Sequence, residues 1–393
     1  MYIDFTEGEI IMSKKLAIIG ASYLQLPLIL RAKEMGIETH VFAWKANDVG
    51  ETAADFFYPI SIIERDNILS KCQEIGIDGI CSIASDTAML TVNYVAEKMG
   101  LTGNSMATTE VSTNKHLMRE CFKEHGDPSP FSIEVINADL IDPASFEYPV
   151  IVKPEDRSGS RGITKVQDPA LLLDAIKNAQ EQSFNGRALV EEFVDGDEFS
   201  VESISWKGVH KILTITKKYT TGSPNFIETA HLEPAFEAGN EIIPKVYDMV
   251  QHALNSLGIQ YGASHTEFKI NSKGELRLIE IGGRMGGDCI GSALVKLSTG
   301  VDFVKAVIDV ALGQKPDSEI TAHNTAAIRY VFTKKDIDVL ESIKQDNRIE
   351  IIEENRIELP DHDVVDSSTR SGYFIFRSTE REPVVHFVSL PRD

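Results

Sequence analysis

The pattern of secondary structure along the chain changes near residue 110, and this change limits the folds that the chain can adopt. Before that point short apolar strands, such as KLAIIG (15–20) and IDGICSIA (77–84), alternate with helical stretches. This alternation is typical of a parallel sheet with helices on both faces. After that point strands follow strands, as in ALVEEFV, DEFSVESISW and HKILTITKKYT between residues 188 and 220. The fold class is therefore α/β in the first part and antiparallel α+β in the second.

The same pattern divides the chain into four parts. Residues 1–11 have an acidic start and no apolar stretch, so we expect a loose extension and no signal peptide. We expect an α/β domain over 12–110, an α+β region over 111–316 and a small β-rich segment over 317–393. The last segment contains three strand-like runs, AAIRYVF, GYFIFRS and PVVHFVSL.

Composition restricts the class of partner. The 393 residues carry a net charge of -21, which argues against a nucleic-acid backbone or an anionic membrane as the main partner. The charge does not argue against ATP, because a local cluster of lysines and arginines can dominate one site. The four cysteines form no CxxC pair, and no apolar run is long enough to span a membrane. We therefore expect a cytoplasmic protein with reduced thiols.

Two carboxylates stand in an unusual place on a predicted β-hairpin. The runs HTEFKI and LRLIEI flank the turn NSKG within residues 265–281. If the middle of NSKG forms the tip, Glu267 faces Leu278, and Glu280 is its diagonal neighbour on the same face, about 7–8 Å away. A one-residue bulge would change this register.

Two like charges on one face need a positive partner. Lys269 lies on the same predicted face, and a hard cation bound by oxygen ligands is the second possibility. The alternative is that both carboxylates point to solvent or pair with a lysine. The following GGRMGG favours the cation, because its glycines permit close backbone approach. The guanidinium of Arg284 in that stretch suits a phosphoryl or carboxylate oxygen.

The segment VIVKPEDRSGSRGITKV (150–166) indicates a place for phosphate. It reads as a strand with Lys153 at its end, followed by a loop of small residues. Backbone N–H groups in such a loop can surround phosphate oxygens, and the lysine adds charge. The pattern is not GxxxxGK[ST], and a mobile loop of the same composition is the alternative. The loop residues concerned are Ser158, Gly159, Ser160 and Gly162.

The segment LVEEFVDGDEFSVE (189–202) offers groups for an adenosine. Backbone groups from Glu191 through Glu192 to Val194 would meet the adenine edge, and the carboxylate of Glu198 would hold the ribose hydroxyls. The alternative is a solvent-facing strand with an acidic turn.

These pieces, in this order, resemble the ATP-grasp superfamily. The motifs are NKHLMRECFKEHGDPSP, YPVIVKPEDRSGSRGI, LVEEFVDGDEFSVE, HTEFKI and LRLIEIGGRMGGD, spread over 112–312. The branch most similar is that of carbamoyl-phosphate-synthetase-like enzymes and L-amino acid ligases, with biotin carboxylase and D-alanine–D-alanine ligase as more distant relatives. The resemblance implies a Rossmann-like pre-ATP-grasp domain, then an ATP-grasp fold of two α+β subdomains. A lid-like subdomain is expected over about 120–190.

The resemblance also implies roles for single residues. Lys115 and Lys153 match the lysines that contact the nucleotide phosphates. Glu267 and Glu280 match the carboxylates that bind Mg²⁺ or Mn²⁺, with Glu280 bridging two ions. Arg284 matches the arginine that steadies the acyl phosphate or the substrate carboxylate, so Arg284 and Lys153 are the expected catalytic residues. The matching loop and hinge positions are Ser158 to Gly162, Glu191, Val194 and Glu198.

One position departs from the family. Many members carry Asn two places after the second metal-binding glutamate, where this chain has Gly282. The second metal ion would lose a protein ligand or take one from elsewhere. The resemblance therefore leaves the number of bound ions open.

The implied activity is that of a carboxylate–amine ligase that uses ATP and forms an acyl phosphate. Its partners would be a small acid or amino acid and an amine, with no nucleic acid and no membrane, and related enzymes are often homodimers. The first alternative is an enzyme that forms carboxy phosphate from bicarbonate. The second is an ATP- or metabolite-binding protein with little turnover. A nicotinamide-dependent dehydrogenase is disfavoured, because GASYLQ (20–25) lacks the GxGxxG spacing.

Two further residues allow two interpretations each. Asp86 follows a predicted strand, so it would either face the substrate cleft or cap a helix. His265 lies on the predicted metal face, where a supporting or packing role is favoured over direct metal ligation.

Overall fold

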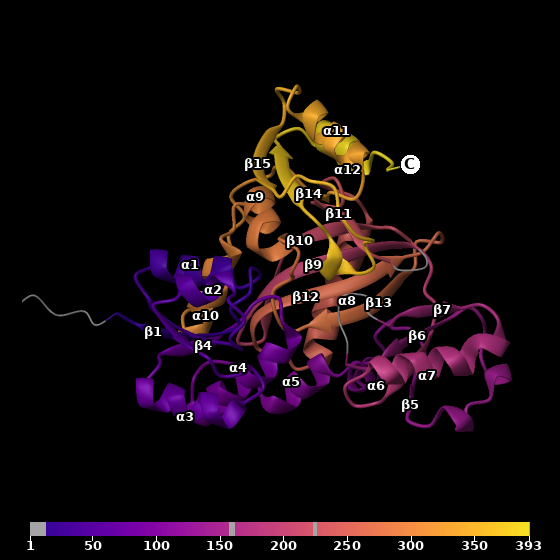
Figure 1. Cartoon of the computed structure of the whole chain (residues 1–393), viewed down its shortest axis with the longest axis horizontal. Coiled ribbons are helices and arrows are strands. Elements are labelled where there is room, and N and C mark those ends of the chain that lie inside the picture. The colour runs from indigo at the N-terminus through magenta and orange to yellow at the C-terminus, as the bar shows by residue number, and fades with distance from the viewer. Residues whose placement is uncertain (1–12, 157–161, 223–225, 393) are drawn as a thin grey trace, which may run out of the picture.

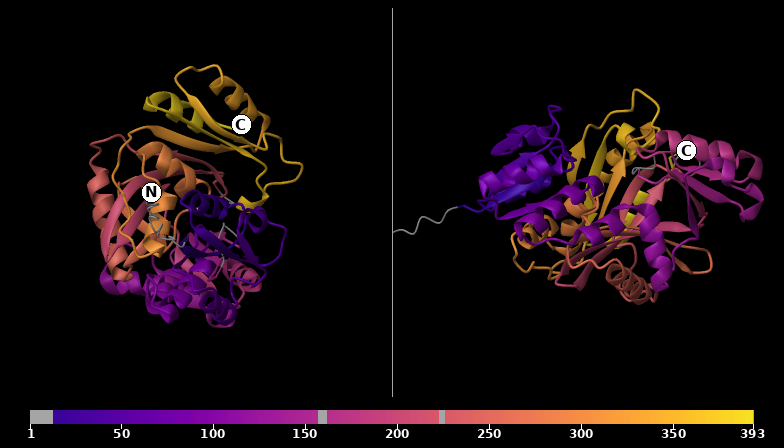
Figure 2. Two further views of the ribbon diagram at one scale, coloured as in Figure 1. Left: turned by 90° about the vertical axis from the view of Figure 1, so that its left-hand side faces the viewer. Right: turned by 90° about the horizontal axis from the view of Figure 1, so that it is seen from below.

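The structure is a computed structural model that describes residues 13–156, 162–222 and 226–392. Within these ranges the strands form three sheets (Figure 1). Figures 1 and 2 show the N-terminal domain at one end of the molecule, a small sheet of β5–β8 at the other, and a large sheet between them. No helix in the described ranges is long and apolar enough to cross a membrane.

The N-terminal domain contains the expected parallel sheet. Its order is β3-β2-β1-β4. Its strands are β1 (Lys15–Ile19), β2 (Glu38–Phe42), β3 (Phe56–Tyr58) and β4 (Gly79–Cys81). Its helices are α1 (Leu26–Glu34), α2 (Val49–Ala53), α3 (Arg65–Ile75) and α4 (Asp86–Met99), with α5 (Met106–Thr113) after them. Side chains of β1 alternate between two cores, because Leu16 and Ile18 enter one and Ala17 and Ile19 the other.

The first of these cores joins the N-terminal domain to the rest of the chain. It includes residues of α10 (Phe303–Ala311), a helix far along the sequence that packs against α1 and β4. The other core is covered by α3 and α4. Helices therefore lie on both faces of the sheet, as the sequence predicted.

A small antiparallel sheet, in the order β5-β8-β6-β7, lies within the part predicted to be lid-like. Its elements are β5 (Ser132–Val135), β6 (Val150–Pro154), β7 (Thr164–Val166), β8 (Ala188–Glu192), α7 (Leu172–Gln182) and the short helices η1 (Ala138–Leu140), η2 (Pro143–Ser145) and η3 (Pro169–Leu171). Val152 and Val190 of the sheet share an apolar core with Ile176 of α7. Asp168 accepts a hydrogen bond from the backbone N–H of Ala170 and so caps the 3₁₀ turn η3, which leads into α7.

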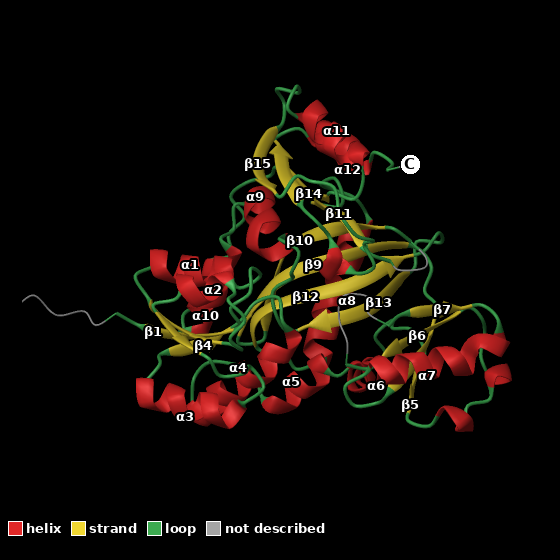
Figure 3. Ribbon diagram, in the orientation of Figure 1, coloured by secondary structure: helices red, strands yellow, loops and turns green. Residues whose placement is uncertain are grey.

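The large sheet has eight antiparallel strands in the order β13-β12-β9-β10-β11-β14-β16-β15 (Figure 3). Its strands are β9 (Asp197–Trp206), β10 (Val209–Thr220), β11 (Glu228–Glu233), β12 (Tyr261–Ile270), β13 (Leu276–Gly282), β14 (Thr325–Tyr330), β15 (Glu350–Asn355) and β16 (Tyr373–Ser378). The last three belong to the segment predicted to be β-rich. That segment therefore continues the same sheet beyond β11.

One face of the large sheet is apolar. Phe199 and Val201 of β9 and Phe268 of β12 pack there on the helices α6 (Lys115–His125) and α8 (Ile242–Ser256). Residues between them in the chain, such as Ser200 and Glu267, point to the opposite face, because side chains alternate along a strand. The second face carries polar groups at Ser200 and Glu267, whereas farther along the strands Ile204 and Ala263 belong to the apolar core shared with the N-terminal domain.

The prediction that PVVHFVSL is a strand is wrong. These residues lie in α12 (Arg381–Ser389), which packs on β14 and β16, and α11 (Lys334–Ile343) is a second helix of the same segment. Helical spacing buries Val384, Phe387 and Val388 together. The buried guanidinium of Arg329 donates to the carbonyls of Phe387, Val388 and Leu390, which have no partner within the helix. Tertiary contacts therefore override the strand propensity of the valines.

The remaining short helices follow β13 and precede β16. They are η4 (Ile290–Leu294), α9 (Val295–Thr299) and η5 (Ser367–Thr369). Both η4 and η5 lie close in sequence to residues of the site described below.

We predict that the apolar face of the large sheet limits the stability of the fold. Phe268 is fully buried and its ring stacks on that of Phe199, with the centroids 5.5 Å apart. Phe268→Ala should lower the free energy of unfolding by about 3–5 kcal/mol, because it leaves a cavity. Chemical denaturation measures this loss. The exposed Phe131 provides the matched Phe→Ala control, and an equal loss in both variants would contradict the prediction.

Candidate functional site

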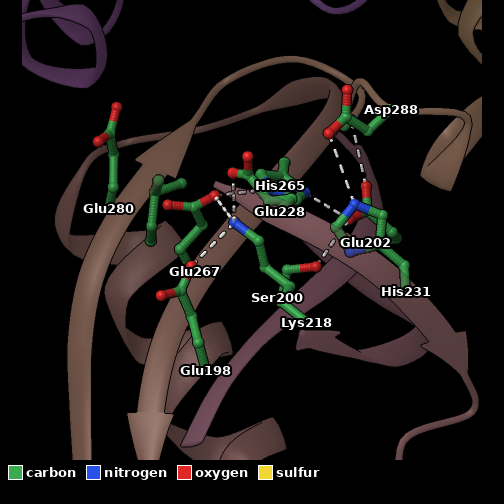
Figure 4. Close-up of polar contacts among 12 residues, drawn as sticks. Glu198, Ser200, Glu202, Lys218, Glu228, His231, His265, Glu267, Glu280 and Asp288 are labelled. Atoms are coloured by element: carbon green, nitrogen blue, oxygen red, sulfur yellow. Dashed lines mark hydrogen bonds and ion pairs between the residues drawn. The ribbon is translucent and has the colours of Figure 1, made fainter. Parts of the chain in front are cut away.

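Polar side chains gather on the second face of the large sheet. Paired residues on neighbouring strands share a face, so each row of pairs brings its side chains together. Two adjacent rows carry them: Glu198, Lys218 and Lys269 in one, and Ser200, Thr216, Glu267 and Glu280 in the next. Figure 4 shows that several of these side chains converge.

The predicted register of the hairpin is wrong, because the turn is longer than expected and one strand contains a bulge. The turn is one residue longer than expected, because Ile270 pairs with Leu276, and the side chain of Asn271 holds the turn by accepting from the backbone of Lys273 and Glu275. The register then shifts between Glu267 and Phe268. As a result Glu267 lies directly opposite Glu280, not diagonal to it. The expectation that both share one face is confirmed.

Lys218 is the positive partner at the centre of this face. Its Nζ lies 2.6 Å from Oε1 of Glu267, 3.0 Å from Oε1 of Glu198 and 3.7 Å from Oε1 of Glu228. Figure 4 shows the ammonium between these carboxylates. Burial alone would lower the pKa of Lys218, but the neighbouring carboxylates raise it well above its ordinary value, so the group stays charged. The sequence pointed to Lys269 for this role, whose Nζ is 3.9 Å from Glu198.

The buried side chain of His265 contacts Glu267. The Nε2 atom of His265 is 3.3 Å from Oε1 of Glu267, and its Nδ1 contacts the buried carboxylate of Glu202. Burial lowers the pKa of His265, but Glu202 raises it to about 9. The backbone N–H of Gly286 donates to the other oxygen of Glu202 at 3.2 Å. His265 therefore connects two carboxylates, which agrees with the supporting role favoured from the sequence.

Glu280 has a lysine partner of its own. The Nζ of Lys115 lies 3.0 Å from Oε1 of Glu280. Lys115 is the first residue of α6, and Asn114 caps that helix by accepting from the backbone of Leu117 at 2.9 Å. The cap fixes the start of α6, and with it the position of the predicted phosphate-binding lysine.

Arg284 forms a bidentate ion pair with Asp86 of the N-terminal domain. The Nε and Nη2 atoms donate to the two carboxylate oxygens at 3.0 and 2.9 Å. Ser85 caps α4 by accepting from Ala88, so the capping role considered for Asp86 belongs to its neighbour. A Cβ on Gly282 would lie 2.9 Å from Oδ1 of Asp86 and 3.0 Å from Cζ of Arg284. The ion pair thus fills the space that a side chain at position 282 would need.

Lys153 lies at the end of β6 with a buried counter-ion. Its Nζ is 2.5 Å from Oε2 of Glu191, whose Oε1 is 2.9 Å from Nε of Arg119. Burial raises the pKa of Glu191, but Arg119 and Lys153 lower it to about 2. The side chain of Glu191 is therefore occupied within the protein, and its predicted contact with adenine could come only from its backbone.

These groups surround one cavity of about 230 Å³ between the small and the large sheet. Ile151, Phe193, Val194, Phe226 and Ile279 form apolar walls. The predicted site residues in its lining are Lys115, Lys153, Glu191, Glu192, Val194, Glu198, Glu267, Glu280 and Arg284. The cavity combines an apolar portion with cations and two paired carboxylates, as a nucleotide with a metal ion would require.

Most of the glycine-rich loop of the predicted site lies outside the residues that the structure describes. Ser158, Gly159 and Ser160 lie outside the described residues. Gly162 is described, has a φ of +70° and does not line the cavity. The phosphate-binding role of the loop therefore stays a prediction.

Sequence reasoning missed several members of the site. Lys218 lies outside the quoted motifs, and Arg119 lies within NKHLMRECFKEHGDPSP, where only Lys115 was given a role. Glu228 and His231 lie on β11, and Arg370 comes from the last segment of the chain. A signal existed for one group, because Glu198, Ser200 and Glu202 alternate with apolar residues along β9.

Comparison with known proteins identifies related sequences and structures. A family profile described as an ATP-grasp domain matches residues 146–292. Alanine–anticapsin ligase of Bacillus subtilis (strain 168) is 26% identical over 327 residues, which is 74% of this chain and 68% of the relative. The crystal structure of an L-amino acid ligase from Bacillus licheniformis has a TM-score of 0.80 and 26% identity, with 96% of each chain covered. An ADP complex of N5-carboxyaminoimidazole ribonucleotide synthetase, at 17% identity, has a TM-score of 0.76 over 95% of each chain.

We predict that the buried carboxyl group of Glu233 makes the free energy of unfolding decrease as pH rises. Glu233 on β11 accepts hydrogen bonds from the hydroxyls of Thr216 and Ser298 at 2.9 and 3.0 Å. Burial and the nearby Glu202 raise its pKa from 4.5 to about 8. Between these two values the folded chain holds a proton that the unfolded chain has lost, so unfolding becomes easier as pH rises.

Glu233→Gln should remove this dependence, because the amide keeps the shape and cannot ionise. Relative to the unmodified chain, the variant should gain about 1 kcal/mol of unfolding free energy per pH unit between pH 5 and 8. Urea denaturation at four pH values measures the difference. The exposed Glu241→Gln is the control, and a difference that stays constant with pH would contradict the assignment.

Proposed function

Because the chain belongs to the ATP-grasp superfamily, we propose that it is an ATP-dependent ligase that joins a carboxylic acid to an amine and releases ADP and phosphate. The proposal follows the alanine–anticapsin ligase and L-amino acid ligase among its relatives. The acid would be a small carboxylate or an amino acid, and the partners are small molecules.

One observation carries this proposal. Lys115, Lys153 and Arg284 line the same cavity as the opposed carboxylates Glu267 and Glu280. The cations can hold phosphate oxygens, while the paired carboxylates beside them can hold a metal ion. Few reactions need both arrangements in one cavity, and phosphoryl transfer from ATP is one of them.

The two carboxylates suit Mg²⁺ when the nucleotide supplies further oxygens. Mg²⁺ is normally held by one or two carboxylates together with substrate phosphates and water. Glu267 and Glu280 are each about a quarter exposed, so their oxygens are accessible. Within the described ranges, no three His, Cys, Asp or Glu side chains are close enough to hold an ion by themselves. We therefore assign metal binding to Glu267 and Glu280 with the nucleotide, where the ion would neutralise charge on the transferred phosphoryl group.

The residues of the chain then act on two successive steps. In the first, a carboxylate oxygen of the acid attacks the γ-phosphorus of ATP, and the bond to the β-phosphate oxygen breaks to release ADP. Lys115, Lys153 and Arg284 stabilise the charge on the oxygens involved. In the second, the neutral amine nitrogen attacks the carbonyl carbon of the acyl phosphate, the bond from that carbon to the phosphate oxygen breaks, and inorganic phosphate leaves while the nitrogen loses a proton to water. The intermediate must be kept from water, which is the role we assign to the loop at 157–162.

The adenosine would occupy the apolar part of the cavity. We propose that the backbone from Glu191 to Val194 meets the adenine edge, with Phe193 and Ile279 among the apolar residues that line the same cavity. Glu198 would bind the ribose hydroxyls, and its contact with Lys218 at 3.0 Å holds it in place. We also propose that the chain forms a homodimer, because related enzymes are often homodimers.

The first experiment is release of ADP and phosphate from Mg-ATP with pooled amino acids, small carboxylates and bicarbonate. We expect release that requires an acid together with an amine. Glu280→Gln should lower it on the order of 100-fold or more, because the amide removes a metal ligand. Glu181→Gln, exposed on α7, is the matched control and should leave the rate unchanged. Release with bicarbonate alone, or no release with any pool, would refute the ligase assignment.

A further inference from the structure

A buried carboxylate connects the two elements that carry the proposed phosphate-binding lysines. Glu155 directly follows β6 and is 1% exposed. Its Oε1 atom accepts a hydrogen bond from Nδ2 of Asn114 at 2.7 Å. Asn114 stands immediately before Lys115 at the start of α6, and Lys153 lies two residues before Glu155 on β6. One hydrogen bond therefore joins the sequence neighbours of both lysines.

The side chain of Asn114 makes two contacts, one with each of its polar atoms. Its Oδ1 accepts from the backbone N–H of Leu117 at 2.9 Å, which caps α6, and its Nδ2 donates to Glu155. The orientation of the amide is fixed, because a backbone N–H can only donate and a carboxylate can only accept. A change of acceptor at position 155 therefore acts on the cap of α6.

Glu155 is fixed on its other side by the turn between α7 and β8. Its Oε2 accepts from Nδ2 of Asn185 at 2.6 Å, and its backbone N–H donates to the carbonyl of Arg187 at 3.3 Å. The next residue, Asp156, accepts from the backbone N–H groups of Phe184 and Asn185 at 3.1 and 2.9 Å. The carboxylate of Glu155 is thus held in place relative to the small sheet.

A second connection between α6 and the small sheet lies one turn further along the helix. Arg119 is four residues after Lys115, so both side chains lie on the same face of α6. The Nε of Arg119 is 2.9 Å from Oε1 of Glu191, whose Oε2 is 2.5 Å from Nζ of Lys153. Two separate attachment points prevent a rotation of α6 against the small sheet that one point alone would permit.

The two lysines come from parts of the structure that have different cores. Lys115 belongs to α6, whose Met118 and Phe122 pack on the apolar face of the large sheet, whereas Lys153 belongs to the small sheet. Phosphoryl transfer depends on charges that are placed in advance around the transferred group. The spacing of the two ammonium groups must therefore be set by contacts between these two parts.

We propose that Glu155 is a positioning residue for the phosphate-binding site, and that through Asn114 it sets the place of Lys115 relative to Lys153. The inference rests on the proposed ATP-dependent function. Within the described part of the chain, the proposed nucleotide cavity is lined by Lys153 and Pro154 but not by Glu155. Glu155 thus acts through Asn114 and not by touching the nucleotide.

A reversal of the hydrogen bond between positions 155 and 114 tests the proposal. In Glu155→Gln the new amide can still accept from Asn185, but its N–H₂ group meets Nδ2 of Asn114, so two donors face each other. Asn114 can turn its own amide only by giving up the cap of α6. Adding Asn114→Asp restores the contact with donor and acceptor exchanged, because the second oxygen of the new carboxylate keeps the cap.

Binding of Mg-ATP and of adenosine, each measured by isothermal titration calorimetry without acid or amine, is the readout. Glu155→Gln should weaken Mg-ATP binding by about 10-fold or more, because the lysines are misplaced. Adenosine binding should stay unchanged, because adenosine has no phosphate for the lysines to hold, and this also shows that the variant is folded. The double variant should regain Mg-ATP affinity to within about 3-fold of the unmodified chain.

Glu275→Gln is the matched control. The exposed carboxylate of Glu275 also accepts from an asparagine amide, Nδ2 of Asn271 at 2.7 Å, but it lies at the tip of the hairpin. This variant should change neither affinity.

The outcomes separate the positioning role from the proposed function. Unchanged Mg-ATP affinity in Glu155→Gln, or a double variant that binds no better than the single one, would overturn the positioning role while the ATP-dependent function stands. An equal loss of adenosine and Mg-ATP binding would overturn it too, because the effect would then not depend on the phosphates. No binding of Mg-ATP to the unmodified chain would overturn the proposed function, and the positioning role with it.

Discussion

Compensation of carboxylate charge on the polar face of the large sheet is the constraint on which the rest of the site depends. Glu267 and Glu280 are directly opposed in neighbouring strands, where like charges destabilise a sheet. Lys218 and Lys115 offset these charges, each with an ammonium within 3.0 Å. The same ammonium groups stand where phosphate and metal would meet the protein. The charges that stabilise this face of the sheet are therefore the ones that we propose a nucleotide and its metal ion contact.

Three distant segments are held together by ion pairs at this face. Asp86 of the N-terminal domain binds Arg284 beyond β13, so the first domain fixes the arginine proposed to act on the acyl phosphate. Arg370 of the last segment binds Asp288, four residues after Arg284. The loop after β13 is thus bound by the N-terminal domain through Asp86 and by the last segment through Arg370.

The local elements were largely predictable, because they depend on neighbours in sequence. The strands β6, β9 and β12 follow from the apolar runs and from the alternation of side chains along the sequence. The carboxylates of Glu267 and Glu280 were expected on one face. Their register was wrong because the turn is one residue longer than expected and a bulge leaves Ile279 without a partner, and nothing in the residues themselves marks either feature. The strand expected at the end of the chain became α12, because Arg329 and the buried valines favour the helix.

The sequence by itself determined which chemical groups are present and which strands and loops carry them. It placed Lys153, Glu198, Glu267, Glu280 and Arg284 in motifs whose order resembles one superfamily. Only the tertiary structure decided which charges meet. Lys115 and Glu280 are 165 residues apart, and Arg370 and Asp288 are 82 apart. Periodicity and capping act over a few residues, whereas these pairings depend on strand order and register, which are set by packing of the whole chain.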